Sequence, residues 1–129
     1  MSTVERHEYV RLLDRIIAAA EAGDPADLEN VYWPDAVIWH NHDNRAQTVQ
    51  QNMKVLVAMG RFVDERRYED RRINVFEGGI VQQHVLRAVR KRDGEPVELH
   101  ACVVCTIRDG RISRLDEYLD SGEVANFWS

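Results

Sequence analysis

The sequence predicts an α+β fold in which N-terminal helices pack on one face of a bent, mainly antiparallel sheet. Two observations predict it. The first half of the chain carries apolar residues at helical spacing, and the last third, residues 79–120, reads as three strands joined by two Asp-Gly turns. With 129 residues, 44% of them hydrophobic, the chain fits a single domain, residues 1–129, that buries a real core.

Two helices are expected at the start of the chain. The first begins at a capping box formed by Ser2 and Glu5, and apolar residues then recur at helical spacing as far as Gly23. Asp24 followed by Pro25 is typical of a helix start, so a short second helix is expected there.

A short strand and a third helix follow. The strand covers residues 36–41, which are rich in Val, Ile and Trp. Asp43 or Asn44 then caps a helix that ends at Gly60. Four apolar residues of this helix are expected to share one face: Val49, Met53, Leu56 and Val57.

A long strand, residues 66–76, opens the antiparallel meander. Its first seven residues, 66–72, are almost all charged, which is typical of a solvated or edge surface rather than a binding site. The order is therefore helix, helix, strand, helix and four antiparallel strands.

Composition excludes several classes of partner. Lys and Arg number 17 against 22 Asp and Glu, and a net charge of -5 is repelled by phosphate backbones, so we expect no nucleic-acid partner. No apolar run is long enough to cross a bilayer, so we expect no membrane partner. The N-terminal residues also lack the pattern of a secretory signal, and a cytoplasmic location is expected.

The turn at Asp109 and Gly110 decides which face of the last strand is buried. A two-residue loop pairs Arg108 with Arg111, whereas a three-residue loop with a glycine bulge pairs Ile107 with Arg111. These two registers send opposite faces of the last strand toward the core.

Burial cost selects the three-residue loop. The other register would bury Arg114, Asp116 and Asp120, whereas this one buries Leu115, Glu117 and Leu119. It sets Glu117 opposite Ala101. The turn at Asp93 and Gly94 in turn sets His84 opposite Val103, with Gln82, His84 and Leu86 facing inward.

Glu117 and His84 are therefore the candidate reactive groups. Burial among apolar residues is expected to raise the pKa of Glu117, which would make this carboxyl a general acid or base near neutral pH. His84 lies two strands away, about 10 Å on a flat sheet. It either exchanges a proton with Glu117 or serves as its structural hydrogen-bond partner. Ile38, His40 and His42 share a face of the first strand and reach the same hollow.

Three segments carry a family resemblance: residues 32–37, 84–88 and 109–120. They resemble the nuclear transport factor 2-like (SnoaL-like) superfamily, which includes limonene epoxide hydrolase, ketosteroid isomerase and polyketide cyclases. The resemblance covers essentially the whole chain. It implies a cone-shaped α+β barrel whose strongly curved sheet wraps around three N-terminal helices, a homodimer, and chemistry without a cofactor.

Similarity to limonene epoxide hydrolase implies roles for individual residues. Its paired catalytic aspartates fall on His84 and Glu117, the arginine between them on Gln82, and its water-holding asparagine on His40. The Asp-Arg-Asp triad itself is not present here. The apolar pocket positions of that enzyme fall on the following residues: Leu86, Leu99, Ala101 and Leu119.

The leading hypothesis is a cofactor-free enzyme that isomerises, dehydrates, cyclises or hydrolyses a small, mostly apolar molecule. Glu117 and His84 act as general acid and base, and His40 orients water or substrate. The residues expected to bind substrate are Ile38, His42, Gln82, Leu86, Leu99, Ala101, Val103, Leu115 and Leu119. One alternative is a ligand-binding or dimerisation module without catalysis. Another is a metal held by His40 and His42, but we expect no metal.

Overall fold

The computed structural model describes residues 7–129, and each long strand of the meander forms where the sequence predicts one. The elements are α1 (Glu8–Ala22), α2 (Leu28–Val31), β1 (Tyr32–His40), β2 (Arg45–Gln47), α3 (Val49–Met59), β3 (Val63–Phe76), β4 (Gly79–Arg90), β5 (Pro96–Arg108), β6 (Arg111–Leu119) and α4 (Ser121–Phe127).

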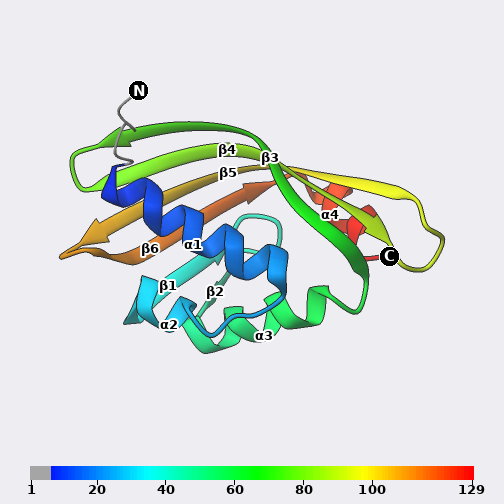
Figure 1. The fold of residues 1–129 in the computed structure, drawn as a ribbon, viewed down its shortest axis with the longest axis horizontal. Coiled ribbons are helices and arrows are strands. Elements are labelled where there is room, and N and C mark those ends of the chain that lie inside the picture. Colours follow the sequence, from blue (N-terminus) through cyan, green and yellow to red (C-terminus); the bar gives the residue numbers. More distant parts are fainter. Residues whose placement is uncertain (1–6) are drawn as a thin grey trace, which may run out of the picture.

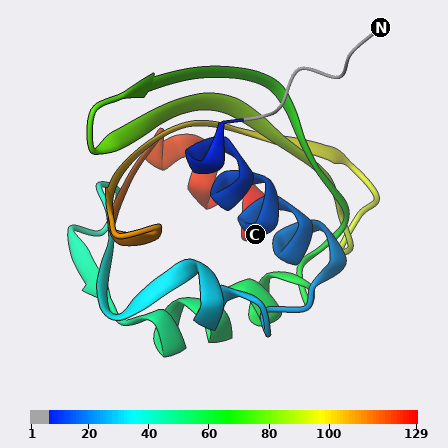
Figure 2. The same cartoon turned by 60° about the vertical axis from the view of Figure 1, so that its left-hand side comes forward.

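One six-stranded sheet has the order β2-β1-β6-β5-β4-β3. Only β1 and β6 pair in parallel, and the other neighbours are antiparallel. The sheet arches over α1, and α2 and α3 lie across the open side (Figures 1 and 2). This arrangement confirms the predicted α+β cone, a mainly antiparallel curved sheet around three N-terminal helices.

The helix ends agree only in part with the sequence prediction. The capping box of Ser2 and Glu5 lies outside the described residues, whereas Gly23 does end α1, with a φ of 71°. The second helix begins at Leu28, later than predicted, because the Asp24 carboxylate accepts the Ala26 N–H and forms a turn instead.

The predicted cap of the third helix is wrong. Asp43 and Asn44 lie in the turn before β2, and Thr48 caps α3 in a capping box with Gln51. Val57 is 47% exposed and therefore does not belong to the buried face of this helix.

The loop between β5 and β6 has two residues, so the predicted three-residue loop is wrong. Arg108 pairs with Arg111, and both Asp109 and Gly110 have a positive φ, as a tight hairpin turn requires. The residue that the predicted loop would have contained is instead a bulge within β6. The register with β5 shifts at Ser113, so the side chains after it face the opposite side of the sheet from the one that the two-residue loop alone would give.

The shift at Ser113 gives the predicted inward face by a different route. Glu117 faces inward as expected, but it pairs with Val103 rather than with Ala101. Across the β4–β5 hairpin, Gln82 also pairs with Val103, and His84 pairs with Ala101 rather than Val103. Gln82, Val103 and Glu117 therefore form one row across three neighbouring strands.

The C-terminal segment folds as α4 and closes one end of the sheet (Figure 1). Phe127 is fully buried in a cluster of apolar side chains. The cluster contains Val63, Leu86, Ala88, Val97 and Leu99.

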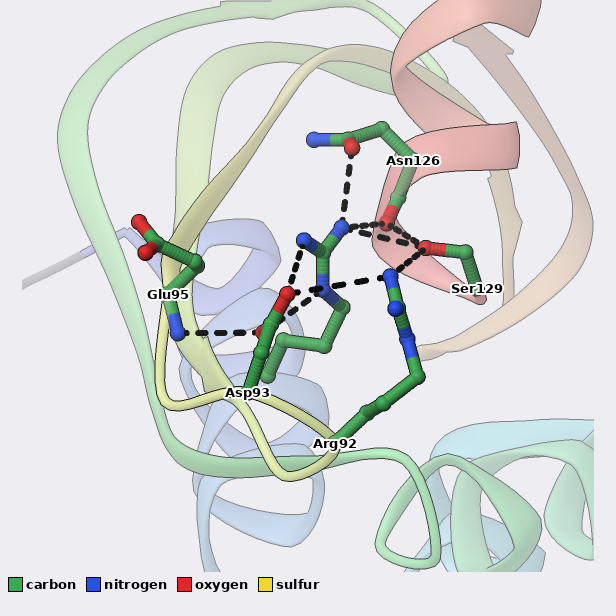
Figure 3. Close-up of polar contacts among 6 residues, drawn as sticks. Arg92, Asp93, Glu95, Asn126 and Ser129 are labelled. Carbon is green, nitrogen blue, oxygen red and sulfur yellow. Dashed lines mark hydrogen bonds and ion pairs between the residues drawn. The ribbon is translucent and has the colours of Figure 1, made fainter.

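The end of α4 is also held by polar contacts with the β4–β5 hairpin (Figure 3). The Arg90 guanidinium, 10% exposed, donates to the Asn126 carbonyl at 2.8 Å and to the Ser129 hydroxyl at 3.0 Å, and it pairs with Asp93 at 2.6 Å. Among the described residues, no helix is long and apolar enough to cross a membrane.

Phe127→Ala is expected to lower the free energy of unfolding by about 3–5 kcal/mol, because it opens a cavity in a closed cluster. Urea denaturation followed by circular dichroism measures the change. Phe76→Ala is the matched control, since Phe76 is 47% exposed and its loss is expected to cost about 1 kcal/mol or less. Equal losses for the two variants would show that α4 is not part of the cooperative core.

Candidate functional site

Two adjoining cavities lie between the concave face of the sheet and the helices. The inner lobe, about 120 Å³, lies against α1, and the outer lobe, about 370 Å³, lies against α4. The residues that line both lobes are His40, Val55, Met59, Tyr68, His84 and Glu117. Most other lining residues are apolar, so the polar groups gather where the two lobes meet.

Every residue that the sequence analysis assigned to the site lines one of the lobes. His40, His84 and Glu117 lie at the junction. The other inner-lobe residues of that set are Ile38, Gln82, Val103 and Leu115, and the outer-lobe residues are His42, Leu86, Leu99, Ala101 and Leu119. Their roles in binding or catalysis stay predictions.

Glu117 is hydrogen-bonded to His40. The Nε2 atom of His40 lies 3.0 Å from Oε1 of Glu117, and the two residues are register partners in the parallel pairing of β1 with β6. Both side chains are largely buried, at 12% and 21% exposure. Among the described residues, no second hydrogen bond to this carboxylate is found, and Glu117 lines both lobes.

The expectation of a raised pKa for Glu117 is wrong. Burial does favour the neutral acid, but the hydrogen bond from His40 and the electrostatic attraction to His40 outweigh it, and the pKa of Glu117 is lowered. The pKa of His40 is raised, because its bond to Glu117 and the nearby carboxylates outweigh the effect of burial. Both shifts therefore favour the ionised pair, a carboxylate facing an imidazolium.

His84 differs from His40 in both partner and charge. Its Nδ1 lies 2.9 Å from the Gln82 side-chain nitrogen, and the residue as a whole is 6% exposed. Burial lowers the pKa of His84, and Arg71 lowers it further, although Glu117 acts in the opposite direction. The two shifts therefore favour the neutral form of His84 and the charged form of His40.

Three comparisons place this geometry among known proteins. A family model, the SnoaL-like domain, matches residues 13–115, which is most of the chain. The chain is a member of the SnoaL-like family. This match confirms the resemblance seen in the sequence. No relative was found among curated proteins.

Solved structures show the same fold at low sequence identity. IdmH from Streptomyces antibioticus, a proposed polyketide cyclase, is 18% identical with a TM-score of 0.82, over 94% of this chain and 98% of that one. A proposed polyketide cyclase from Xanthomonas campestris is 16% identical with a TM-score of 0.81, over 95% and 97%. A ketosteroid isomerase-like protein from Catenulispora acidiphila, in complex with trimethylamine, is 12% identical with a TM-score of 0.78, over 91% of each chain.

The sequence analysis of this SnoaL-like domain missed several residues of the site, and two of them, which contact His84 and Gln82, lie in the charged start of β3. The Tyr68 ring lies 5.1 Å from the His84 ring, between their centroids, and lines both lobes. Arg71 donates from Nε to Oε1 of the Gln82 side-chain amide at 2.8 Å. The prediction that residues 66–72 form only a solvated edge is therefore wrong.

Two bulges in β3 explain the miss. The register with β4 shifts between Asp64 and Arg67 and again between Glu69 and Arg72. Each shift turns the strand over, so Tyr68 and Arg71 both face inward although they lie three residues apart. The only sequence signal was the isolated tyrosine within a charged run.

His42 stands apart from the junction. It lies beyond the end of β1 on the wall of the outer lobe, with its ring 5.8 Å from that of His40, between centroids, and its Nε2 3.8 Å from Asp43. Within residues 7–129, no three or more His, Cys, Asp or Glu side chains are grouped so that they could hold a metal ion.

The two histidines are expected to titrate on opposite sides of 6.5, the ordinary pKa of histidine. Nuclear magnetic resonance (NMR) of protein labelled with ¹⁵N in histidine should give a midpoint above 6.5 for His40 and below 6.5 for His84. Glu117→Gln removes the carboxylate, so the midpoint of His40 should fall. An unchanged His40 midpoint in this variant would contradict the ion pair.

Proposed function

We propose that this SnoaL-like domain is a cofactor-free enzyme that moves a proton on a small, mostly apolar molecule bound in the two lobes. One observation carries the proposal: the Glu117 carboxylate is hydrogen-bonded to His40 at the place where two mostly apolar lobes meet. A base and an acid in contact, both shielded from bulk water, are the groups that general acid–base catalysis needs.

The protonation states assign the roles. Glu117, as the carboxylate that its lowered pKa favours, takes a proton from a carbon of the substrate, and the positive charge of His40 then balances the negative charge of the enolate that forms. His40 can donate its own proton to the product, and the proton held by Glu117 then passes to His40 across their hydrogen bond, which restores the starting pair. This changes the partner expected from the sequence: the group in contact with Glu117 is His40, not His84.

A lowered pKa makes Glu117 a weak base, and this restricts the substrate. Proton transfer to a weak base is efficient only when the carbon acid is itself fairly acidic, such as a carbon between two carbonyl groups. The cavity walls favour apolar rings or chains on either side of that carbon. Several structural neighbours are named as proposed polyketide cyclases or isomerases. Cyclisation and isomerisation can both begin with the removal of a proton from an acidic carbon.

A ligand-binding module without catalysis is the second candidate. The observation that favours it is the closed hydrogen bond between His40 and Glu117, which satisfies both side chains without a substrate. Under this reading the lobes retain an apolar molecule unchanged. A cytoplasmic location, a homodimer and a single domain over residues 1–129 stay predictions.

The direct test is hydrogen–deuterium exchange at an acidic carbon. Purified protein is incubated in D₂O with ethyl 2-oxocyclohexanecarboxylate, a ring β-keto ester, and loss of the proton between the two carbonyl groups is followed by ¹H NMR. Glu117→Gln is expected to lower the protein-catalysed rate about 100-fold or more, because the base is lost.

Asp116→Asn is the matched control for this exchange assay. Asp116 directly precedes Glu117 on β6, accepts a hydrogen bond from Arg114, and lines neither lobe. The exchange rate with Asp116→Asn should therefore equal that with the parent protein. Exchange no faster than in buffer alone, or equal rates for Glu117→Gln and the parent, would reject catalysis on this substrate class and favour the binding module.

A further inference from the structure

In the part of the chain that the structure describes, one hydrogen-bonded chain of side chains contains both buried side-chain atoms that lack a hydrogen-bond partner. Among residues 7–129, the buried side-chain nitrogens and oxygens without a hydrogen-bond partner are Nη2 of Arg71 and Nε2 of His84. A buried polar group without a partner is costly. The one on His84 belongs to a ring that lines both lobes, so it lies where a ligand would bind.

The direction of this chain follows from the chemistry of arginine. A guanidinium group has only N–H donors. Arg71 donates from Nη1 to the Asp14 carboxylate at 2.9 Å and from Nε to Oε1 of Gln82 at 2.8 Å. The oxygen of the Gln82 side-chain amide is therefore fixed on the Arg71 side.

The other end of the amide then determines the tautomer of His84. With its oxygen toward Arg71, Gln82 presents its NH₂ group to Nδ1 of His84, at 2.9 Å. A nitrogen that accepts a hydrogen bond carries no proton, so a neutral His84 must carry its proton on Nε2. The unsatisfied atom is thus a donor that lacks an acceptor.

We propose that Arg71 and Gln82 are positioning residues that hold His84 as a neutral Nε2–H donor, and that this donor binds an oxygen of the ligand, such as a carbonyl or enolate oxygen. His84 then neither takes nor gives a proton in the reaction. The part of this inference that concerns the ligand rests on the proposed function, whereas the tautomer is a property of the ligand-free domain.

The surroundings of His84 agree with a neutral donor. Asp14 balances the charge of Arg71, the Tyr68 ring lies beside the imidazole, and the Glu117 carboxylate is already paired with His40. A ligand oxygen that accepts from Nε2 removes the cost of the buried donor. It would also be stabilised there as negative charge develops on it, since the donor is already oriented.

The tautomer is read directly by two-bond ¹H–¹⁵N NMR correlation of histidine-labelled, ligand-free protein. The parent is expected to show His84 neutral and protonated on Nε2. In Gln82→Glu the new carboxylate can only accept, so Nδ1 of His84 must gain a proton, which gives the Nδ1–H tautomer or the imidazolium. Gln83→Glu, at the exposed neighbouring position of β4, should leave the spectrum of His84 unchanged.

Arg71→Met provides a second variant should Gln82→Glu fail to fold. Without Arg71 the Gln82 amide is free to turn over, so His84 is expected to show a mixture of both tautomers. Arg72→Met, an exposed neighbour in β3, is the control and should match the parent. An Nδ1–H tautomer in the parent, or Arg71→Met and Arg72→Met spectra that agree, would overturn the positioning role.

The acceptor preference is tested with a matched pair of probes, cyclohexanone and methylenecyclohexane, which differ only in C=O against C=CH₂. Cyclohexanone is expected to shift the Nε2 resonance of His84 and to bind at least about tenfold more tightly than methylenecyclohexane. Equal affinities, or no ketone-induced shift, would overturn the ligand assignment. Because neither NMR test measures turnover, a failed exchange assay leaves these results intact, and the two proposals fail separately.

Discussion

The Glu117 carboxylate is buried where the two lobes meet, and a buried carboxylate stays ionised only where positive charge lies close to it. His40 supplies that charge at 3.0 Å, and it can do so because β1 pairs in parallel with β6 and makes the two residues register partners. The parallel pairing is the exception in this sheet, and the position of the charged pair depends on it. Loss of either partner would leave the other charge buried alone.

The same pair links stability to pH. Because the pKa of Glu117 is lowered, this group stabilises the fold at pH values above 4.5, the ordinary pKa of glutamate. This stabilisation is lost as the pH falls through the pKa of the folded state. A raised pKa of His40 contributes stability below 6.5, and this is lost as the pH rises through the folded-state value. The pair therefore stabilises the fold most between these two limits.

Much of the fold and the composition of the pocket could be predicted from the sequence because side chains on a strand alternate. Both predicted hairpin registers were wrong by two residues, yet an error of two keeps every side chain on its face. Glu117 and His84 therefore faced inward as expected although the predicted cross-strand partner of each was wrong. The bulge at Ser113 could not be located, because the burial argument fixes only which face is turned inward. A two-residue loop followed by a bulge buries the same face as a three-residue loop.

The missed parts of the site depend on contacts that alternation does not encode. The bulges of β3 turn that strand over twice, which brings Tyr68 and Arg71 inside a run that reads as solvated. The contact between His40 and Glu117 joins segments 77 positions apart through the parallel pairing of β1 with β6, so the sequence pattern paired Glu117 with His84 instead. Because the sequence did not reveal His40 as the hydrogen-bond partner of Glu117, the predicted direction of the Glu117 pKa shift was also wrong.

The ionisation of Glu117 is therefore the central claim, and it can be measured on the residue itself. The ¹³C resonance of the Glu117 side-chain carboxyl, assigned by comparison with Glu117→Gln, is followed as the pH is lowered. The ion pair with His40 predicts a midpoint below 4.5, the ordinary value for glutamate. A midpoint near neutral pH would mean that desolvation dominates, that Glu117 is a neutral acid, and that His40 does not hold its charge.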